Sequence, residues 1–280
     1  MVFLLLPKCK GDIMARNNNG WSDQKLKRYI HEGRGQGTGK EYSPWTKTHE
    51  FSSIGRATRI LGIKTGRIHH FHSDQQLKAF LIFEWSDKVV DIRESFPLLD
   101  VLAVIDDQDD LRFDKFCNKE TGEQMVITTN FVLTIKDADG SERDVARTIK
   151  NSTELTKKIM FEKLEIERRY WRAKEIEWKV VTDKQLPKQL AKNIEWVRDT
   201  LLDQVGDGVE KEPLSVILHK NLLAYPDIVL KDLFRHFDKT EGVPKGTGLY
   251  LFRYLIAKKE IRIEMSSTID FSKKVSNILL

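Results

Sequence analysis

The sequence predicts a mixed α/β domain followed by a smaller, mostly helical domain, and three observations support this prediction. Short β-rich runs alternate with amphipathic stretches from residue 89 to residue 183. Two of these runs, 125–136 and 141–150, flank a turn signal at 137–140, which is typical of an antiparallel hairpin. A helix and another strand then follow, and this order favours a mixed sheet with flanking helices. After residue 185 the chain reads as successive helices.

Length and composition limit the classes of protein. A chain of 280 residues corresponds to about two domains. With 40% hydrophobic and 32% charged residues it is neither disordered nor fibrous, and it contains no apolar run of the length that crosses a membrane. The net charge of +5 is compatible with a polyanionic partner but does not identify one, because charges of both signs are interspersed. Two cysteines are too few for a disulfide framework, so we expect a cytoplasmic protein.

The amino end is predicted to be an extension covering residues 1–20. Residues 1–13 are apolar and differ from the polar, basic segment that begins at Met14. Either Met14 is the true start, or the first 13 residues form an extra strand or arm. The segment has no basic n-region and no small-residue cleavage site, so it is a poor signal peptide.

Residues 21–50 are predicted to contain a helix and a basic loop. Ser22 is a suitable N-cap for a helix that ends near Gly33. Alternating glycines follow up to Lys40. They do not form a phosphate-binding loop of the P-loop type, because no strand precedes them and the Gly-Lys-Ser/Thr sequence is missing. We expect a flexible basic loop, whose role, if it has one, is contact with a nucleic-acid backbone.

Residues 64–116 are predicted to contain a turn, two strands and a helix. A turn at Thr65 leads into a strand at 67–71, and Ser73 caps the helix that follows. His69, His70 and His72 suggest a metal site, but no carboxylate or cysteine completes a tetrahedral set, so we do not expect zinc here. A β-rich run covers 89–99, and the acidic stretch 100–116 reads as a loop inserted between strands.

A long amphipathic helix is predicted for residues 152–174, and a buried strand for 175–183. Ser152 or Thr153 is the expected cap of this helix. The residues expected on its core side are Leu155, Ile159, Leu164 and Trp171.

This layout suits metal-assisted cleavage of phosphodiesters. Such nucleases place acidic oxygens at the end of one strand, and a ligand and a lysine two residues apart on the next, so that both side chains face one pocket. The carboxylates hold Mg²⁺, which stabilises the developing charge. Thr148 and Lys150 have the required spacing, and Asn130 lies on the facing strand. The spacing is right, but the ligand chemistry is not.

Several blocks of sequence, in order and across both predicted domains, give the chain a specific resemblance to the TnsA family. This family provides the endonuclease subunit of heteromeric bacterial cut-and-paste transposases. The blocks that carry the resemblance are EGRGQGTGK (32–40), KTGRIHH (64–70), SDQQLKAFLIFEW (73–85), VVDIRESFPLL (89–99), EKLEIERRYW (162–171), WKVVTDK (178–184) and NIEW (193–196).

The resemblance implies a fold, an activity and partners. The fold is a restriction-endonuclease-like domain, which we assign to residues 21–184, and a winged-helix-like domain at 185–280. The activity is Mg²⁺-dependent cleavage at the 5′ ends of the transposon. The partners are the DNA of the transposon ends, a TnsB-like DDE transposase and a TnsC-like ATPase that contacts the carboxyl-terminal domain.

The catalytic positions of the family are largely replaced in this chain. Gln76 stands at the position of a catalytic Glu, and Asn130 at that of a metal-binding Asp. Thr148 replaces a Gln or acidic residue, whereas Lys150 is retained. Glu167 matches a further carboxylate near the site. Neutral oxygens hold Mg²⁺ poorly against its hydration shell, so the metal positions Gln76, Asn130 and Thr148 are expected to bind weakly or not at all.

Two versions of this fold remain open at the level of sequence. In one, the nuclease works with Asp139, Glu142 or Asp144 as substitute acids, although these residues fall in or beside the turn. In the other, which we favour, the site has decayed or been inactivated and the subunit is kept for assembly. A different class of function is also possible, namely a regulatory DNA-binding module in which a relict nuclease domain positions a winged helix.

The carboxyl-terminal segment is predicted to bind rather than to cut. A helix at 186–205 is followed by a linker, by three further helices and by a β-rich run, IRIEM, which is the order of a winged helix. Its basic residues are either DNA contacts or a solvated surface. Across the whole chain, the basic residues predicted to contact DNA are Arg34, Lys40, Arg56, Arg67, Arg253 and Lys258.

Overall fold

The computed structural model describes residues 21–50, 56–118, 121–202 and 210–280. The chain divides into two compact units, residues 1–186 and 187–280. The predicted boundary lay close by, between residues 184 and 185. The predicted extension at 1–20, including the alternative start at Met14, lies outside the described residues.

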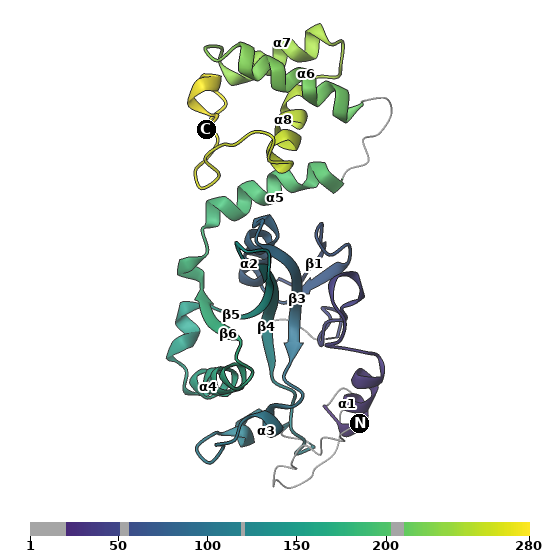
Figure 1. The fold of residues 1–280 in the computed structure, drawn as a ribbon, viewed down its shortest axis with the longest axis vertical. Helices are drawn as coiled ribbons and strands as arrows, with labels where there is room; N and C mark the ends of the chain where they lie inside the picture. Colours follow the sequence, from purple (N-terminus) through teal and green to yellow (C-terminus); the bar gives the residue numbers. More distant parts are fainter. Residues whose placement is uncertain (1–20, 51–55, 119–120, 203–209) are drawn as a thin grey trace. The chain divides into compact units, whose positions relative to one another are not determined.

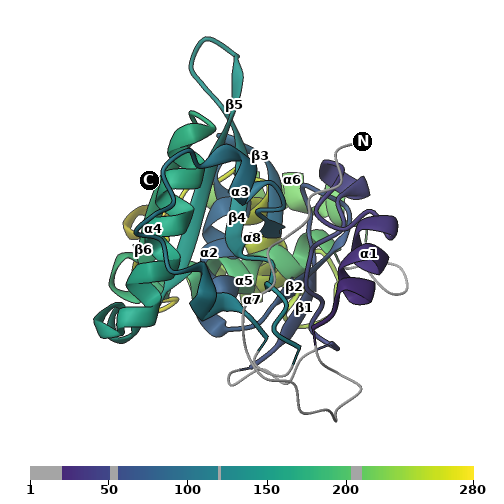
Figure 2. The same ribbon diagram turned by 90° about the horizontal axis from the view of Figure 1, so that it is seen from below.

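The first unit is built on a four-stranded mixed sheet with the order β3-β4-β5-β6 (Figure 1). Strands β3 (Val89–Pro97), β4 (Thr128–Lys136) and β5 (Glu142–Lys150) are antiparallel neighbours. Strand β6 (Glu177–Thr182) pairs with β5 in parallel, and helix α4 (Lys158–Ala173) makes the crossover between them. This is the predicted mixed sheet, and Figure 2 shows α4 running alongside it.

Both faces of the sheet are covered. On one face, Val132 and Ala146 pack against Ile166, Tyr170 and Trp171 of α4. On the other face, Phe131 contacts Phe83 of helix α2 (Asp74–Trp85), and it contacts Phe71 of the hairpin formed by β1 (Thr58–Leu61) and β2 (Ile68–Phe71). Alternate residues of β4 therefore bury aromatic and aliphatic surface on opposite sides.

The helix caps follow the sequence in two places and depart from it in a third. Ser22 caps α1 (Asp23–His31) and Ser73 caps α2, as predicted. Ser152 and Thr153 do not cap a long helix. Instead, Asn151 and Glu154 form a capping box for the short 3₁₀ helix η3 (Ser152–Thr156), and α4 begins only at Lys158. Ile159 is consequently exposed and does not reach the core.

Two segments predicted as loops have more order than expected. The stretch 100–116 contains α3 (Val101–Val104) and the 3₁₀ helix η2 (Phe113–Phe116), and Val101, Ile105 and Leu111 are buried. In the glycine-rich loop, Gly33, Gly35, Gly37 and Gly39 all have positive φ. A Cβ on Gly35 would lie 2.2 Å from a ring carbon of Pro97, so this loop is closely packed on β3.

The second unit contains helices α5 (Lys188–Leu202), α6 (Lys211–Ala224), α7 (Leu230–Thr240) and α8 (Thr247–Ala257). Helix α8 is its core element, with Leu251, Phe252 and Leu255 fully buried. The predicted strand IRIEM is not a regular strand, because only an isolated bridge joins Ile263 to Leu279. Over the described residues, no helix is both long and apolar enough to cross a membrane.

Candidate functional site

The predicted pocket lies where β4 and β5 separate. Their antiparallel pairing runs from Lys136 opposite Glu142 to Phe131 opposite Arg147, and Asn130 is the next residue along β4. The side-chain oxygen Oδ1 of Asn130 accepts a hydrogen bond from the backbone N–H of Ile149 at 2.7 Å. The amide of Asn130 thus joins the two strands just past the last backbone pair.

Thr148 is fully buried and its hydroxyl is used twice. Its Oγ1 donates to Oε2 of Glu167 and accepts from Nε1 of Trp178 at 3.0 Å. Glu167, also fully buried, receives a second hydrogen bond from Oγ1 of Thr129 at 2.9 Å. Its other oxygen, Oε1, lies 3.4 Å from Nζ of Lys163. The charge of this carboxylate is therefore balanced inside the protein.

Lys150 is different, because it has no hydrogen-bond or ion-pair partner among the residues that the structure describes. It is half-buried at the end of β5, and burial lowers the pKa of its ammonium group. The positive charge of Lys163 lowers that pKa further. The carboxylates of Glu167 and Glu154 act in the opposite direction, but burial is the largest influence and the pKa stays below its ordinary value.

Gln76 lies in the first turn of α2. Its backbone N–H donates to the capping Ser73 at 3.3 Å, and its Oε1 accepts from the backbone N–H of His72 at 2.8 Å. The hydrogen bond of this amide is local, within the turn that starts the helix. The structure thus gathers Thr148, Glu167 and Lys150 at the end of β5, whereas Gln76 is held by its own helix start.

These residues do not fit a magnesium ion. The three positions expected to ligate it present neutral oxygens, and all three oxygens accept or donate hydrogen bonds within the protein. Mg²⁺ binds through carboxylates and gives up water reluctantly, and two lysines nearby oppose a divalent cation. Across the described ranges, no group of three or more His, Cys, Asp or Glu side chains is arranged to hold a metal ion.

Two of the three candidate substitute acids are engaged elsewhere, and the third is exposed. Asp139 lies in the exposed turn and accepts from Ser141, and Asp144 pairs with Arg93 and Thr134. Glu142 is exposed at the start of β5. In Figure 2 the turn between β4 and β5 extends away from the rest of the domain.

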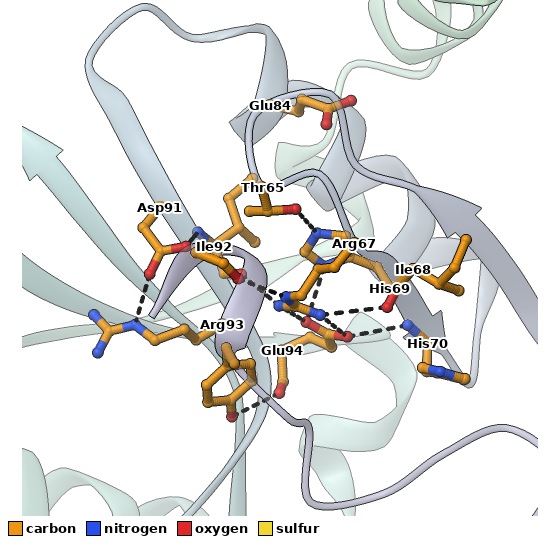
Figure 3. Close-up of polar contacts among 12 residues, drawn as sticks. Thr65, Arg67, Ile68, His69, His70, Glu84, Asp91, Ile92, Arg93 and Glu94 are labelled. Carbon is orange, nitrogen blue, oxygen red and sulfur yellow. Dashed lines mark hydrogen bonds and ion pairs between the residues drawn. The ribbon is translucent and has the colours of Figure 1, made fainter. Parts of the chain in front are cut away.

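A second polar cluster lies on the other face of the sheet, and the sequence analysis did not predict it (Figure 3). Arg67 makes two hydrogen bonds to the buried carboxylate of Glu94, at 2.9 and 2.6 Å. His69 lies between them and Thr65: its Nδ1 is 2.9 Å from Glu94, and its Nε2 is 2.7 Å from Oγ1 of Thr65. Burial alone would raise the pKa of Glu94, but His69 and Arg67 outweigh burial and hold the pKa at about 2.

A sequence signal for this Glu94 cluster was available. Arg67, just before β2, alternates with His69 and Phe71 of the strand, and the burial of Phe71 places the two polar residues on the inner face. The three histidines that suggested a metal each have a protein partner. His70 is bonded to Thr48, and His72 to Thr46.

Two predicted DNA contacts are corrected by their burial. Arg34 is buried, stacks 3.5 Å from the ring centroid of Tyr29 and pairs with Glu50 and Glu32. Arg67 is occupied by Glu94. Neither guanidinium group is available to a phosphate, because each is already enclosed with its carboxylate.

The other four candidates lie nearer the surface. Lys40 and Arg56 are exposed. In the second unit, the Arg253 guanidinium donates to the carbonyl oxygen of Trp196, and Lys258 pairs with glutamates at 212 and 260. These four residues stay predictions.

The sheet order, the helices on both faces and the separated ends of β4 and β5 are those of a restriction-endonuclease-like fold. Two family models match the chain. The first, "TnsA-like endonuclease N terminal", covers residues 86–183, and the second, "TnsA endonuclease C terminal", covers residues 185–265.

A similar protein of known identity points to the same family. The transposon Tn7 transposition protein TnsA of Escherichia coli is 38% identical over 211 residues, which are 74% of this chain and 75% of that protein. The chain therefore belongs to the TnsA endonuclease family and is a TnsA-like transposase subunit.

Proposed function

We propose that this chain is a TnsA-like subunit that has lost DNA cleavage and is retained for assembly of the transposition complex at the 5′ ends of its element. The observation that carries the proposal is that neutral side chains occupy the three positions expected to bind the metal. Gln76, Asn130 and Thr148 are uncharged, and their oxygens bond within the protein. Without anionic ligands at these three positions, the pocket offsets little of the charge of a metal ion that would activate water, because Glu167 is already ion-paired with Lys163.

The remaining charges in the pocket support binding of DNA without cutting. Lys163 pairs with Glu167, whereas the ammonium group of Lys150 has no hydrogen-bond or ion-pair partner among the described residues. An unpaired, partly desolvated cation favours an anion such as a backbone phosphate. Replacing acids by neutral residues also removes their repulsion of that phosphate.

The partners proposed for the complex are transposon-end DNA, a TnsB-like DDE transposase and a TnsC-like ATPase that docks on the second unit. Support for these partners comes from membership of the family, since both units match family models. We place the protein in the cytoplasm, where such a complex would meet chromosomal DNA.

The test is strand cleavage at transposon ends in the presence of Mg²⁺ and the partner transposase. The natural chain is expected to leave the 5′ strand intact, and the double variant Gln76→Glu with Asn130→Asp is expected to nick it. Adding Lys150→Ala to the double variant should abolish nicking. Cleavage by the natural chain that is lost in its Lys150→Ala variant would contradict the proposal.

A further inference from the structure

The β1–β2 hairpin has one face against the domain and one face in solvent. On the inner face, His69 and Phe71 are buried. On the outer face, Leu61 lies opposite Ile68, with exposed fractions of 41% and 47%. Ile63, in the connecting loop, is partly exposed as well. Among the residues that the structure describes, the hairpin thus presents a small, partly exposed apolar surface.

The charge of the hairpin is entirely positive. From residue 51 to residue 73 the sequence has no Asp or Glu, but it has Arg56, Arg59, Lys64 and Arg67. Lys64 and Arg67 are used inside the domain. Arg56 and Arg59 are exposed and have no ion pair among the residues that the structure describes. By strand register Arg59 shares the outer face with Leu61 and Ile68, and Arg56 lies in the chain just before β1.

The hairpin is held rigidly on the sheet, as Figure 3 shows for its inner side. Arg67 and His69 anchor it to the Glu94 carboxylate of β3. The backbone N–H of Ile63 donates to Glu84 of α2 at 2.6 Å, and Nζ of Lys64 donates to the carbonyl oxygen of Ser86 at 2.6 Å. The positions of the outer side chains relative to the sheet are thus fixed before any partner binds.

We propose that the outer face of the β1–β2 hairpin is a contact surface for duplex DNA. Arg56 and Arg59 would bind backbone phosphates, while Leu61 and Ile68 would pack against the groove. A two-stranded ribbon fits the major groove of B-DNA, and the absence of acidic residues matches a polyanion better than a protein surface of mixed charge. This inference takes from the proposed function only the choice of DNA as the partner.

The experiment measures binding of the full chain to a labelled end duplex by fluorescence anisotropy, in EDTA and over a range of salt concentrations. Arg59→Ala should reduce the slope of log affinity against log salt by about 0.9, and Arg56→Ala with Arg59→Ala by about 1.8, with roughly tenfold or more loss of affinity. Leu61→Ser with Ile68→Ser should lower affinity about threefold at an unchanged slope.

Arg172→Ala is the matched control, because it removes one exposed charge from α4. It should leave the slope as in the natural chain. Melting curves identify any variant that fails to fold, and the exposed arginine substitutions should not change them. If Arg59→Ala and the double variant bind as Arg172→Ala does, the proposal is overturned. Because nothing is cleaved in EDTA, this result is independent of whether the pocket is silent.

Discussion

The two polar clusters of the first unit differ in what balances their charges. In the Glu94 cluster the charge is paired within the protein: the carboxylate of Glu94 binds the guanidinium group of Arg67 and is hydrogen-bonded with His69 on the hairpin side of the sheet. In the pocket at the end of β5, the positions that a metal would satisfy hold Asn130 and Thr148, and Lys150 is unpaired among the described residues. When two buried charges pair with each other in the fold, replacing one of them leaves the other unpaired and lowers the stability of the protein. Charged residues whose charge is balanced only by a bound ligand can be replaced without this loss of stability.

The largest expected effect is the loss of Glu94. Glu94→Gln should lower the free energy of unfolding by about 3–5 kcal/mol, because it leaves Arg67 buried without its counter-charge. Chemical denaturation measures this. The control is Glu142→Gln, an exposed carboxylate on β5, which should change stability by less than about 0.5 kcal/mol. A loss below about 1 kcal/mol in Glu94→Gln would remove the contrast between the two clusters.

The pH dependence of stability should report the same carboxylate. The pKa of Glu94 in the folded protein, about 2, is below its ordinary value of 4.5, so its contribution is complete above pH 4.5 and is lost as the pH falls toward 2. The contribution is about 3 kcal/mol by order of magnitude. The difference in unfolding free energy between the natural chain and Glu94→Gln should therefore stay constant from pH 7 to 5 and shrink below pH 4.5. A difference that does not change down to pH 3 would contradict the assignment.

In the pocket, Thr148 should matter for stability and not for metal. Thr148→Val should cost about 1–3 kcal/mol, because Glu167 loses a donor and Nε1 of Trp178 loses its acceptor in the interior. Thr240→Val on the exposed surface of α7 serves as the control, with less than about 0.5 kcal/mol expected. Equal stability of the two variants in denaturant would mean that the hydroxyl of Thr148 is not part of the fold.

The smallest expected effect is the stabilisation by Mg²⁺, which should differ between the natural pocket and a pocket in which the two acidic residues have been reintroduced. Millimolar Mg²⁺ should leave the melting temperature of the natural chain unchanged. Gln76→Glu with Asn130→Asp should melt at a lower temperature in EDTA and regain about 1.4 kcal/mol when Mg²⁺ is present at ten times its dissociation constant. Ca²⁺ tests the same binding without cleavage. A Mg²⁺-dependent shift in the natural chain would show that its neutral oxygens do bind the ion.

The sheet, its hairpin and the flanking helices could be predicted because local signals agree there: Ser22 and Ser73 cap helices, and a turn joins two β-rich runs. The start of α4 was predicted too early. Asn151, one residue before the expected cap, forms a capping box with Glu154 that starts a short 3₁₀ helix, and α4 itself begins only at Lys158. The prediction of a strand at IRIEM is wrong, because in the described residues this segment forms an isolated bridge from Ile263 to Leu279 and no regular ladder.

Only part of the candidate site could be predicted, because the sequence does not show which polar side chains are buried and bonded within the protein. Sequence spacing located Thr148 and Lys150, but it could not show that the hydroxyl of Thr148 is bonded to Glu167 and Trp178, which come from distant elements. Arg34 and Arg67 are predicted from sequence to contact DNA because they are basic, and their charge alone does not reveal that they are buried. Their carboxylate partners, Glu50 and Glu94, are remote in sequence, so tertiary structure decides their roles.

The hydrogen bonds that fix the hairpin loop also bear on the thermodynamics of recognition. Ordering a flexible loop on binding would cost conformational entropy and weaken the complex. Here Ile63 and Lys64 are already bonded to α2 and to the segment that follows it, so that entropy is lost when the chain folds. A ligand that meets this hairpin should therefore associate with a small ordering penalty, and calorimetry should register little entropic loss from the protein.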